Sequence, residues 1–335
     1  MKVLLYGRKC RPNANYSLEN VFSDIAQRLR HQCEIQQRIA PCFSNGILPR
    51  LRIIRDVKQN QLPVTHVTGD ISFAILGADR KSSMVTIPDC GFVKHSTGIA
   101  RFLKKMFWLQ RPVRHARVVT TISGAAKREI VEMCPWARDK VHVVPIAISQ
   151  DFQPKGERAF SKVPRILHVG TAPNKNVLRL IQSLEGIRCE LTIIGVLPNV
   201  ELEALQRHGI DFRNRFGLSS REVVEEYQRA DLVAFVSTYE GFGMPILEAQ
   251  AVGVPVVTSN QSSMPEVAGD GAVLVDPWDV GSIREGIQRV INDQDLRNET
   301  IAHGFRNVLR YDPQEIAGMY LKLYYEIWND FSNAI

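Results

Sequence analysis

The feature that most constrains the fold is the alternation of short apolar runs, rich in β-branched residues, with longer segments of helical period. This alternation is typical of βα units whose parallel strands are buried on both faces of a sheet. It predicts an α/β protein with two successive series of strands. The expected strands are residues 2–6, 64–67, 84–87, 118–122 and 141–145 in the first series, and 165–169, 191–195, 211–216, 232–236, 254–258 and 272–275 in the second.

A polar segment at residues 149–164, with two prolines, one glycine and no apolar period, separates the two series. The length of 335 residues also fits two domains of ordinary size. Two doubly wound units in succession would hold a ligand between the carboxyl ends of their sheets. We therefore predict domains at residues 1–150 and 164–311, joined by a linker at 151–163.

The segment at residues 312–335 is predicted to be a helix. One of its faces is apolar, and such a stripe needs a core to pack against. We expect the helix to return to the first domain. The stripe consists of Ile316, Met319, Tyr320, Leu323, Tyr324, Ile327 and Trp328.

Charge is divided unevenly along the chain. The formal net charge of +7 results from 42 Lys and Arg against 35 Asp and Glu. Residues 1–155 carry 25 basic and 11 acidic residues, whereas residues 156–335 carry 17 and 24. A basic half indicates an anionic partner. We do not expect a nucleic acid, because no zinc finger, aromatic RNA-binding motif or helix-turn-helix pattern accompanies the charge.

The cysteines and the apolar runs predict a cytoplasmic protein. The six cysteines form no C-x-x-C pair, so we interpret them as reduced thiols. The apolar run from Val3 to Tyr6 is too short for a signal-peptide core, and no run approaches the roughly 18 residues of a membrane-spanning helix. A peripheral membrane contact stays open. The eight histidines form no metal-ligand cluster.

One segment, residues 237–249, joins the end of an expected strand to the start of a helix. Gly241 and Gly243 permit positive φ angles and close approach of a ligand, and Pro245 suits the first helical position. The helix N-terminus would attract a phosphate, while a carboxylate of Glu240 or Glu248 could accept two neighbouring sugar hydroxyls. The alternative is that Glu248 is a first-turn acid favoured by the helix dipole and Glu240 a solvated loop charge.

With these residues the chain resembles the retaining glycosyltransferases of family 4, because Glu240 and Glu248 match the E-x7-E motif of that family. The resemblance implies the GT-B fold, with two Rossmann-like doubly wound domains facing across a cleft. It covers much of the second half and is thinner in the first. Matching segments are 166–171, 175–176, 191–195, 216–219, 227–231, 254–259, 265–269 and 272–277, and in the first half 66–70, 86–89, 120–123 and 143–145.

The resemblance further implies transfer of a hexose from a UDP- or GDP-linked sugar to a glycan, lipid-linked or other acceptor, as in polysaccharide biosynthesis. Configuration would be retained, and neither a metal nor a further cofactor would take part. Glu248 would bind the ribose and Glu240 the donor sugar, while Lys175 would stabilise the departing diphosphate. Donor contacts are implied for Gly241, Phe242, Gly243, Met244, Gly170, Thr171, Phe216 and Gly217, although Phe216 could equally be core.

The sequence departs from the family pattern at three places. Thr171 stands where many members have arginine. Gly7 is the single glycine of a loop that is often glycine-rich, which leaves Arg8, Lys9 and Arg11 as acceptor-side charges. Pro88 replaces a histidine and precedes Asp89. Asp89 would orient acceptor or donor hydroxyls, or it is only a turn residue before Gly91.

Two questions stay open at the level of sequence. The basic stretch at residues 100–117 fits a helix on an anionic membrane, but we favour a helix that covers the sheet, since its apolar residues have ordinary core spacing. The departures allow a non-catalytic sugar-nucleotide-binding subunit or a sugar-nucleotide epimerase as rival functions. A Rossmann dehydrogenase is excluded, because no G-x-G-x-x-G follows a strand.

Overall fold

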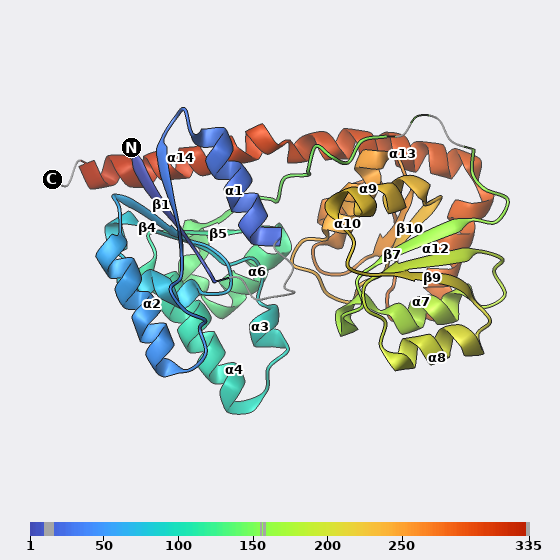
Figure 1. Cartoon of the computed structure of the whole chain (residues 1–335), viewed down its shortest axis with the longest axis horizontal. Helices are drawn as coiled ribbons and strands as arrows, with labels where there is room; N and C mark the ends of the chain where they lie inside the picture. Colours follow the sequence, from blue (N-terminus) through green and yellow to red (C-terminus); the bar gives the residue numbers. More distant parts are fainter. Residues whose placement is uncertain (10–16, 155, 157–158, 333–335) are drawn as a thin grey trace. The chain divides into compact units, whose positions relative to one another are not determined.

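The computed structural model describes residues 1–9, 17–154, 156 and 159–332. The chain divides into two compact units (Figure 1). Unit 1 comprises Met1–Ala147 and Pro313–Ile335, and unit 2 comprises Ile148–Asp312. The first unit is therefore built from two separate stretches of chain.

Unit 1 is built on a six-stranded parallel sheet with the order β2-β1-β3-β4-β5-β6. The strand β2 was missed in the sequence, because only one of its six residues is even partly buried and the others are exposed. An edge strand paired on one side needs no apolar run. The strands are β1 (Lys2–Gly7), β2 (Glu34–Ile39), β3 (Val64–Val67), β4 (Ser83–Thr86), β5 (Val118–Thr121) and β6 (Val141–Val143).

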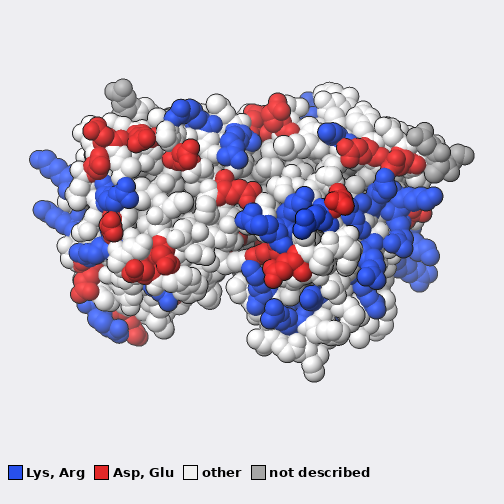
Figure 2. All heavy atoms as spheres, turned by 180° about the vertical axis from the view of Figure 1, so that it is seen from behind, with Lys and Arg blue, Asp and Glu red and all other residues white. Residues whose placement is uncertain are grey.

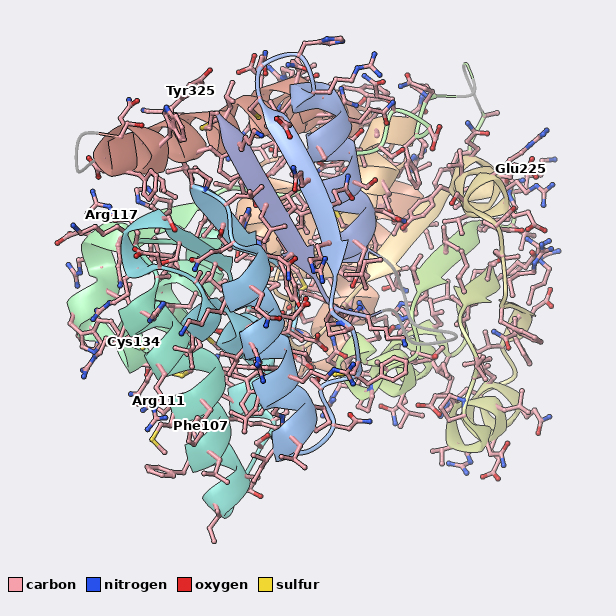
Figure 3. All side chains as sticks on the ribbon, turned by 60° about the vertical axis from the view of Figure 1, so that its left-hand side comes forward. Phe107, Arg111, Arg117, Cys134, Glu225 and Tyr325 are labelled. Carbon is pink, nitrogen blue, oxygen red and sulfur yellow. The ribbon has the colours of Figure 1, made fainter. Side chains whose placement is uncertain are left out.

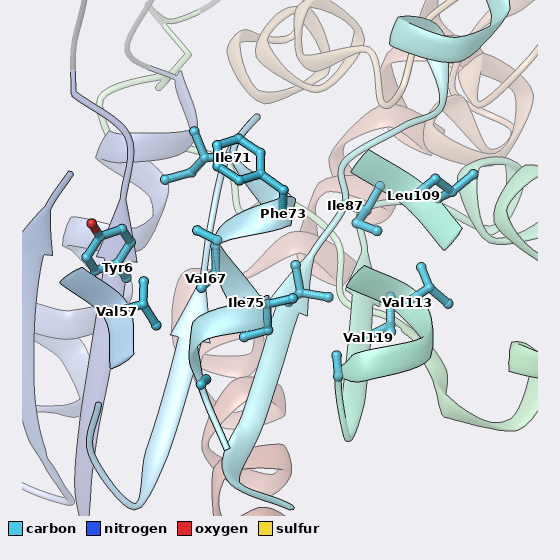
Figure 4. Packing of buried hydrophobic residues seen from close by; sticks show 14 of the residues in the cluster. Tyr6, Val57, Val67, Ile71, Phe73, Ile75, Ile87, Leu109, Val113 and Val119 are labelled. Carbon is cyan, nitrogen blue, oxygen red and sulfur yellow. The ribbon is translucent and has the colours of Figure 1, made fainter. Parts of the chain in front are cut away.

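Helices cover both faces of this sheet. On one face, Tyr6, Val67 and Val119 of the sheet meet Val57 of α2 and Val113 of α5 in an apolar core (Figure 4). Lys105–Gln110 is a π-helical segment, η3, that joins α4 to α5. The helices are α1 (Ser17–Leu29), α2 (Ile47–Asn60), α3 (Gly91–Lys94), α4 (Gly98–Lys104), α5 (Arg111–His115), α6 (Gly124–Met133) and α14 (Pro313–Ser332), with 3-10 turns η1 (Ser72–Gly77), η2 (Arg80–Ser82) and η4 (Pro135–Lys140).

The other face is covered by α1 and α14, whose apolar side chains share one cluster with β1. A buried polar bridge fixes α14 there: His66 Nδ1 lies 2.9 Å from the Tyr324 hydroxyl and His66 Nε2 lies 2.7 Å from Thr86 Oγ1. Burial lowers the pKa of His66 to about 3, so the ring is neutral. Met319 is 45% exposed, so its assignment to the buried stripe was wrong.

Unit 2 has a second six-stranded parallel sheet, ordered β12-β11-β10-β7-β8-β9. The order reverses between β7 and β10, and such a switch point is where doubly wound sheets bind ligands. The elements are β7 (Arg165–Val169), η5 (Pro173–Lys175), α7 (Val177–Leu184), β8 (Glu190–Ile194), α8 (Asn199–Arg207), β9 (Asp211–Arg215), α9 (Ser220–Arg229), β10 (Leu232–Phe235), α10 (Met244–Val252), β11 (Val256–Ser259), α11 (Met264–Ala268), β12 (Val273–Val275), α12 (Val280–Asn292), α13 (Gln294–Val308) and η6 (Leu309–Tyr311).

Two parallel sheets with helices on their faces confirm the predicted α/β class. Ser219 and Glu222 form a reciprocal capping box at the start of α9, as their spacing predicts. Among the described helices, none is both long and apolar enough to cross a membrane.

Candidate active site

The predicted site residues of unit 2 gather at the carboxyl end of its sheet, around the switch point. The loop after β7 carries Gly170, Thr171 and Lys175, and the loop after β10 carries Glu240 and Gly243. Since β7 and β10 are neighbours in the sheet, these loops meet although some 65 residues separate them. This sheet order explains why the two parts of the site lie together.

Lys175 ends the short turn η5 and reaches back over Gly170. Gly170 has a φ of +96°, and a Cβ built on it would lie 2.8 Å from Lys175 Cε. Glycine is therefore required there both for the backbone and for the path of the lysine. The ammonium lies 4.7 Å from the centre of the Phe235 ring, a favourable cation–π contact.

Lys175 forms an ion pair with Glu240. The Nζ to Oε1 distance is 2.6 Å, and only 20% and 14% of the two side chains are exposed. Asn174 donates from Nδ2 to the same carboxylate oxygen at 3.2 Å and to the Tyr239 carbonyl at 2.9 Å. Glu240 is thus a desolvated, paired carboxylate and not the solvated loop charge of the alternative interpretation.

Two serines hold the backbone of this loop. The Ser262 hydroxyl donates to the Glu240 carbonyl at 2.6 Å. The Ser263 hydroxyl lies 2.9 Å from that carbonyl and 2.6 Å from the Phe242 carbonyl. Sequence reasoning missed both serines and Asn174, because polar residues of these types are common in loops and nothing local marks them.

The helix α10 begins at the end of the loop, at Met244. Gly243, at the N-cap position, has a φ of +112°, and no side chain caps the helix. The sequence predicted Pro245 at the first helical position, but in the structure Pro245 is the second residue of the helix. The Phe242 side chain is buried and packs edge-on against Tyr311. Uncapped N–H groups and the helix dipole make this end of α10 suitable for an anion.

Glu248 is the fifth residue of α10, so the prediction that it lies in the first turn was wrong. Its Oε2 accepts a hydrogen bond of 2.5 Å from the hydroxyl of Tyr227, a fully buried residue of α9. Burial raises the pKa of Glu248 to about 6, while Tyr227 and Lys175 act in the opposite direction. The carboxylate is therefore poised to change charge just below neutral pH, and Tyr227 is a neighbour that the sequence did not reveal.

The remaining donor-side candidates line the same edge of the sheet. A Cβ on Gly195, at the end of β8, would lie 3.0 Å from both the methyl and the hydroxyl of Thr171. Phe216 follows β9 and is 65% exposed, so the interpretation of Phe216 as core is wrong. Gly217 has a φ of +66° and open space around it. An exposed aromatic ring can stack on a planar ligand.

The acceptor-side candidates belong to unit 1. Gly7 ends β1, and Arg8 follows it with Nε 2.5 Å from Glu19 Oε1 and Nη1 3.1 Å from Asp70 Oδ2. Arg8 and Asp70 follow β1 and β3, which flank the switch point of this sheet. Lys9 lies over the Phe43 ring at 5.2 Å. Arg11 lies outside the described residues.

Asp89 follows β4 in unit 1. Its Oδ1 accepts a hydrogen bond of 2.7 Å from the Gly91 backbone, which is the turn geometry of the alternative interpretation. The Pro88 carbonyl accepts a hydrogen bond from Thr121 Oγ1 at 3.2 Å. The loop is therefore well anchored, and a role of Asp89 toward substrate stays a prediction.

No three His, Cys, Asp or Glu side chains in residues 1–9, 17–154, 156 and 159–332 are grouped so that they could hold a metal ion. The charges that the site in unit 2 offers to a ligand are those of Lys175, Glu240, Glu248 and the N-terminus of α10.

Residues 149–306 match the family described as glycosyl transferases group 1. The O-antigen chain mannosyltransferase B of Escherichia coli is 27% identical over 238 residues, which are 65% of this chain and 62% of that protein. The chain thus spans less than two thirds of the length of that relative.

Solved structures resemble the whole fold. A glycosyltransferase from Rickettsia africae has a TM-score of 0.74 at 17% identity, over 97% of this chain and 98% of the other. HepE of Anabaena, determined in complex with UDP and glucose, has a TM-score of 0.77 at 15% identity, over 96% and 99%. These likenesses confirm the predicted GT-B class of two Rossmann-like domains.

Proposed function

We propose, from the match of residues 149–306 to the family described as glycosyl transferases group 1, that the protein transfers a hexose from a nucleotide diphosphate sugar to an acceptor. We further propose that the anomeric configuration is retained and that no metal ion is needed. The observation that carries the proposal is the desolvated Lys175–Glu240 pair, which lies at the switch point of the sheet in unit 2.

The diphosphate of the donor competes with Glu240 for Lys175. In the ligand-free site the lysine is neutralised by the carboxylate at 2.6 Å. A diphosphate at the N-terminus of α10 offers more negative charge, so the ammonium turns to it and Glu240 becomes available to hydroxyls of the sugar. Glu248 holds the ribose hydroxyls through Oε1, because Oε2 already accepts from Tyr227. The exposed ring of Phe216 stacks on the base.

The reaction exchanges one bond to the anomeric carbon for another. The bond from that carbon to the diphosphate oxygen breaks, and a bond to an acceptor oxygen forms on the same face. The acceptor proton passes to the departing diphosphate, so no side-chain base is required at Pro88. Lys175 and the N–H groups of α10 stabilise the charge that grows on the leaving group.

The donor sugar is proposed from the likeness to a relative, and the acceptor from the charge of the first half of the chain. The Escherichia coli relative is named a mannosyltransferase of the O-antigen chain, so mannose is the first sugar to test, on UDP and on GDP. The acceptor is proposed to be a glycan or lipid-linked sugar that binds unit 1 near Gly7 and Arg8, and the basic first half of the chain favours an anionic acceptor. The cytoplasmic location stays a prediction.

Thermal shift with nucleoside diphosphates followed by transfer assays tests the proposal. A ligand at 100 times its dissociation constant should stabilise unit 2 by about 2.7 kcal/mol. The tenfold or greater loss of affinity expected for Lys175→Ala should lower this stabilisation to about 1.4 kcal/mol or less. Transfer from a panel of sugar nucleotides should persist in EDTA, and NMR of the product should show the donor's anomeric configuration.

Binding without transfer or hydrolysis on any acceptor would contradict the proposal and favour a non-catalytic sugar-nucleotide-binding subunit. Interconversion of donors without an acceptor would favour an epimerase.

A further inference from the structure

Unit 1 exposes large apolar side chains on two neighbouring helices. On α2, Ile47, Leu48 and Leu51 are 74%, 79% and 55% exposed. On α4, the exposed fractions of Ile99, Phe102 and Leu103 are 79%, 62% and 42%. The guanidinium of Arg50 on α2 lies 4.5 Å from the centre of the Trp108 ring on η3, which directly follows α4. α2 therefore contacts the segment that continues α4, and the two helices run side by side in Figures 1 and 3. We call these six apolar residues the apolar ridge.

The chain around the apolar ridge contains no acidic residue. Residues 35–55 hold four Arg and neither Asp nor Glu, and residues 90–128 hold nine Lys and Arg and again neither. Arg52, Arg101 and Lys104 are exposed beside the ridge, and none of the described ion pairs includes them. Figure 2 shows white atoms at the lower tip of unit 1, where α4 lies in Figure 1, and blue atoms above them.

The positive charge continues along the helix beyond the ridge. Arg111 stacks on Phe107 at 4.5 Å, and both point outward from the same helix in Figure 3. Arg114 and Lys140 flank the exposed ring of Trp136 at 5.1 and 5.7 Å. Burial is the largest cause of the lowered pKa of Lys140, and the nearby charges of Arg80 and Arg114 act in the same direction.

A partner of this surface must accept apolar side chains and carry negative charge. A second copy of this chain would bring the same positive surface against itself, which costs free energy. An anionic bilayer offers a boundary that accepts apolar side chains and headgroups that attract Lys and Arg. We propose that the apolar ridge and its flanking cations form a peripheral docking surface for an anionic lipid bilayer.

The two halves of the basic stretch at residues 100–117 differ in burial. Leu109 and Val113 are fully buried in the core of unit 1, whereas α4 keeps its apolar residues in solvent. The second half therefore covers the sheet, as we had favoured for the whole stretch, and joins α4 to the core of unit 1. The first half carries the docking surface.

Co-sedimentation of the full chain with vesicles tests this proposal without any measurement of transfer. The wild type should pellet with vesicles of phosphatidylcholine mixed with phosphatidylglycerol and stay in solution with phosphatidylcholine alone. Binding should weaken as salt rises. The triple variant Ile99→Ser, Phe102→Ser, Leu103→Ser should bind about tenfold or more weakly. The double variant Arg101→Gln, Lys104→Gln should bind about thirtyfold more weakly.

The matched control replaces two apolar residues of unit 2, Val196→Ser and Val200→Ser, which are 70% and 61% exposed. The control should bind vesicles as the wild type does. All variants should keep the wild-type melting temperature, because the altered side chains lie in solvent. Equal pelleting with both vesicle types, no pelleting with either, or full binding by the triple variant would overturn the proposal. Self-association that the triple variant abolishes, without vesicle binding, would assign the ridge to a second copy.

Discussion

Lys175 and Glu240 neutralise each other in a place from which water is largely excluded. With 20% and 14% of their side chains exposed, either charge alone would be costly to keep there. A bound anion can therefore take the place of Glu240 as the partner of Lys175. The two residues should respond to substitution in opposite ways when ligand binding is measured.

We expect Glu240→Gln to slow transfer by about two orders of magnitude. The binding of a nucleoside diphosphate should not weaken, because the diphosphate no longer competes with a carboxylate for Lys175. Lys175→Ala should weaken that binding about tenfold or more. Titration calorimetry with the diphosphate and initial rates with the sugar nucleotide measure the two effects. A parallel loss of diphosphate affinity in both variants would show that the pair acts only as a structural unit.

Burial raises the pKa of Glu248, and the 2.5 Å hydrogen bond from Tyr227 opposes that rise. Because this bond favours the ionised carboxylate, Tyr227→Phe should raise the Glu248 pKa above its present value of about 6. The ionised form accepts ribose hydroxyls, so donor affinity should decline as pH falls through about 6 in the wild type and at higher pH in the variant.

Donor affinity measured between pH 5 and 8 tests this shift, with the exposed Tyr325→Phe as the control. Identical pH profiles for Tyr227→Phe and the wild type would remove Tyr227 from donor binding, whatever its effect on stability.

At the scale of elements, two helical glycines have opposite surroundings. A Cβ on Gly286 of α12 would lie 2.4 Å from Val275 Cγ1 of β12, whereas Gly318 of α14 has open space within 4 Å and is exposed. Gly286 therefore permits the close packing of α12 on the sheet. Gly318 has no such task.

Gly286→Ala should lower the free energy of unfolding by about 1 to 3 kcal/mol through overpacking. Gly318→Ala should raise it by about 0.5 to 1 kcal/mol, because alanine loses less conformational entropy in a helix. Urea denaturation of both variants measures the difference. Destabilisation of equal size in the two variants would mean that the packing of α12 does not require glycine.

The buried His66 makes the stability of unit 1 sensitive to acid. Its pKa is about 3 in the folded chain and about 6.5 when unfolded, so the unfolded state binds the extra proton. The contribution of neutral His66 to the free energy of unfolding is therefore fully present above about pH 6.5 and is lost as the pH falls toward 3. Between pH 7 and 5 the loss from this residue should be about 2 kcal/mol.

Hydrogen exchange of the β3 and β4 amides at pH 7 and 5 isolates this effect to unit 1. The His66→Gln variant should be less stable at pH 7 but should lose about 2 kcal/mol less on acidification than the wild type. The variant His31→Gln, altered at an exposed histidine, is the control. An unchanged pH dependence in His66→Gln would refute the account.

The architecture could be predicted from the sequence because buried parallel strands are continuous apolar runs and the E-x7-E residues stand close together in one segment. What escaped prediction depends on contacts between distant segments. Tyr227 reaches Glu248 from another helix, and Asn174 reaches Glu240 across the switch point. The strand β2 is polar, and the exposure of Phe216 depends on what packs around it.

The return of α14 to unit 1 has a consequence for how the protein is made. The core beside β1 includes Ile316, Tyr320 and Tyr324, which leave the ribosome only after all of unit 2 has been synthesised. At roughly 5 to 20 residues per second, translation of the intervening segment takes roughly 10 to 30 s. During that interval the nascent first domain exposes the groove that α14 will fill, while Ile148–Asp312 is free to fold as a continuous segment. The unit begun first is thus completed last, and a chaperone that binds apolar grooves would find its target there during synthesis.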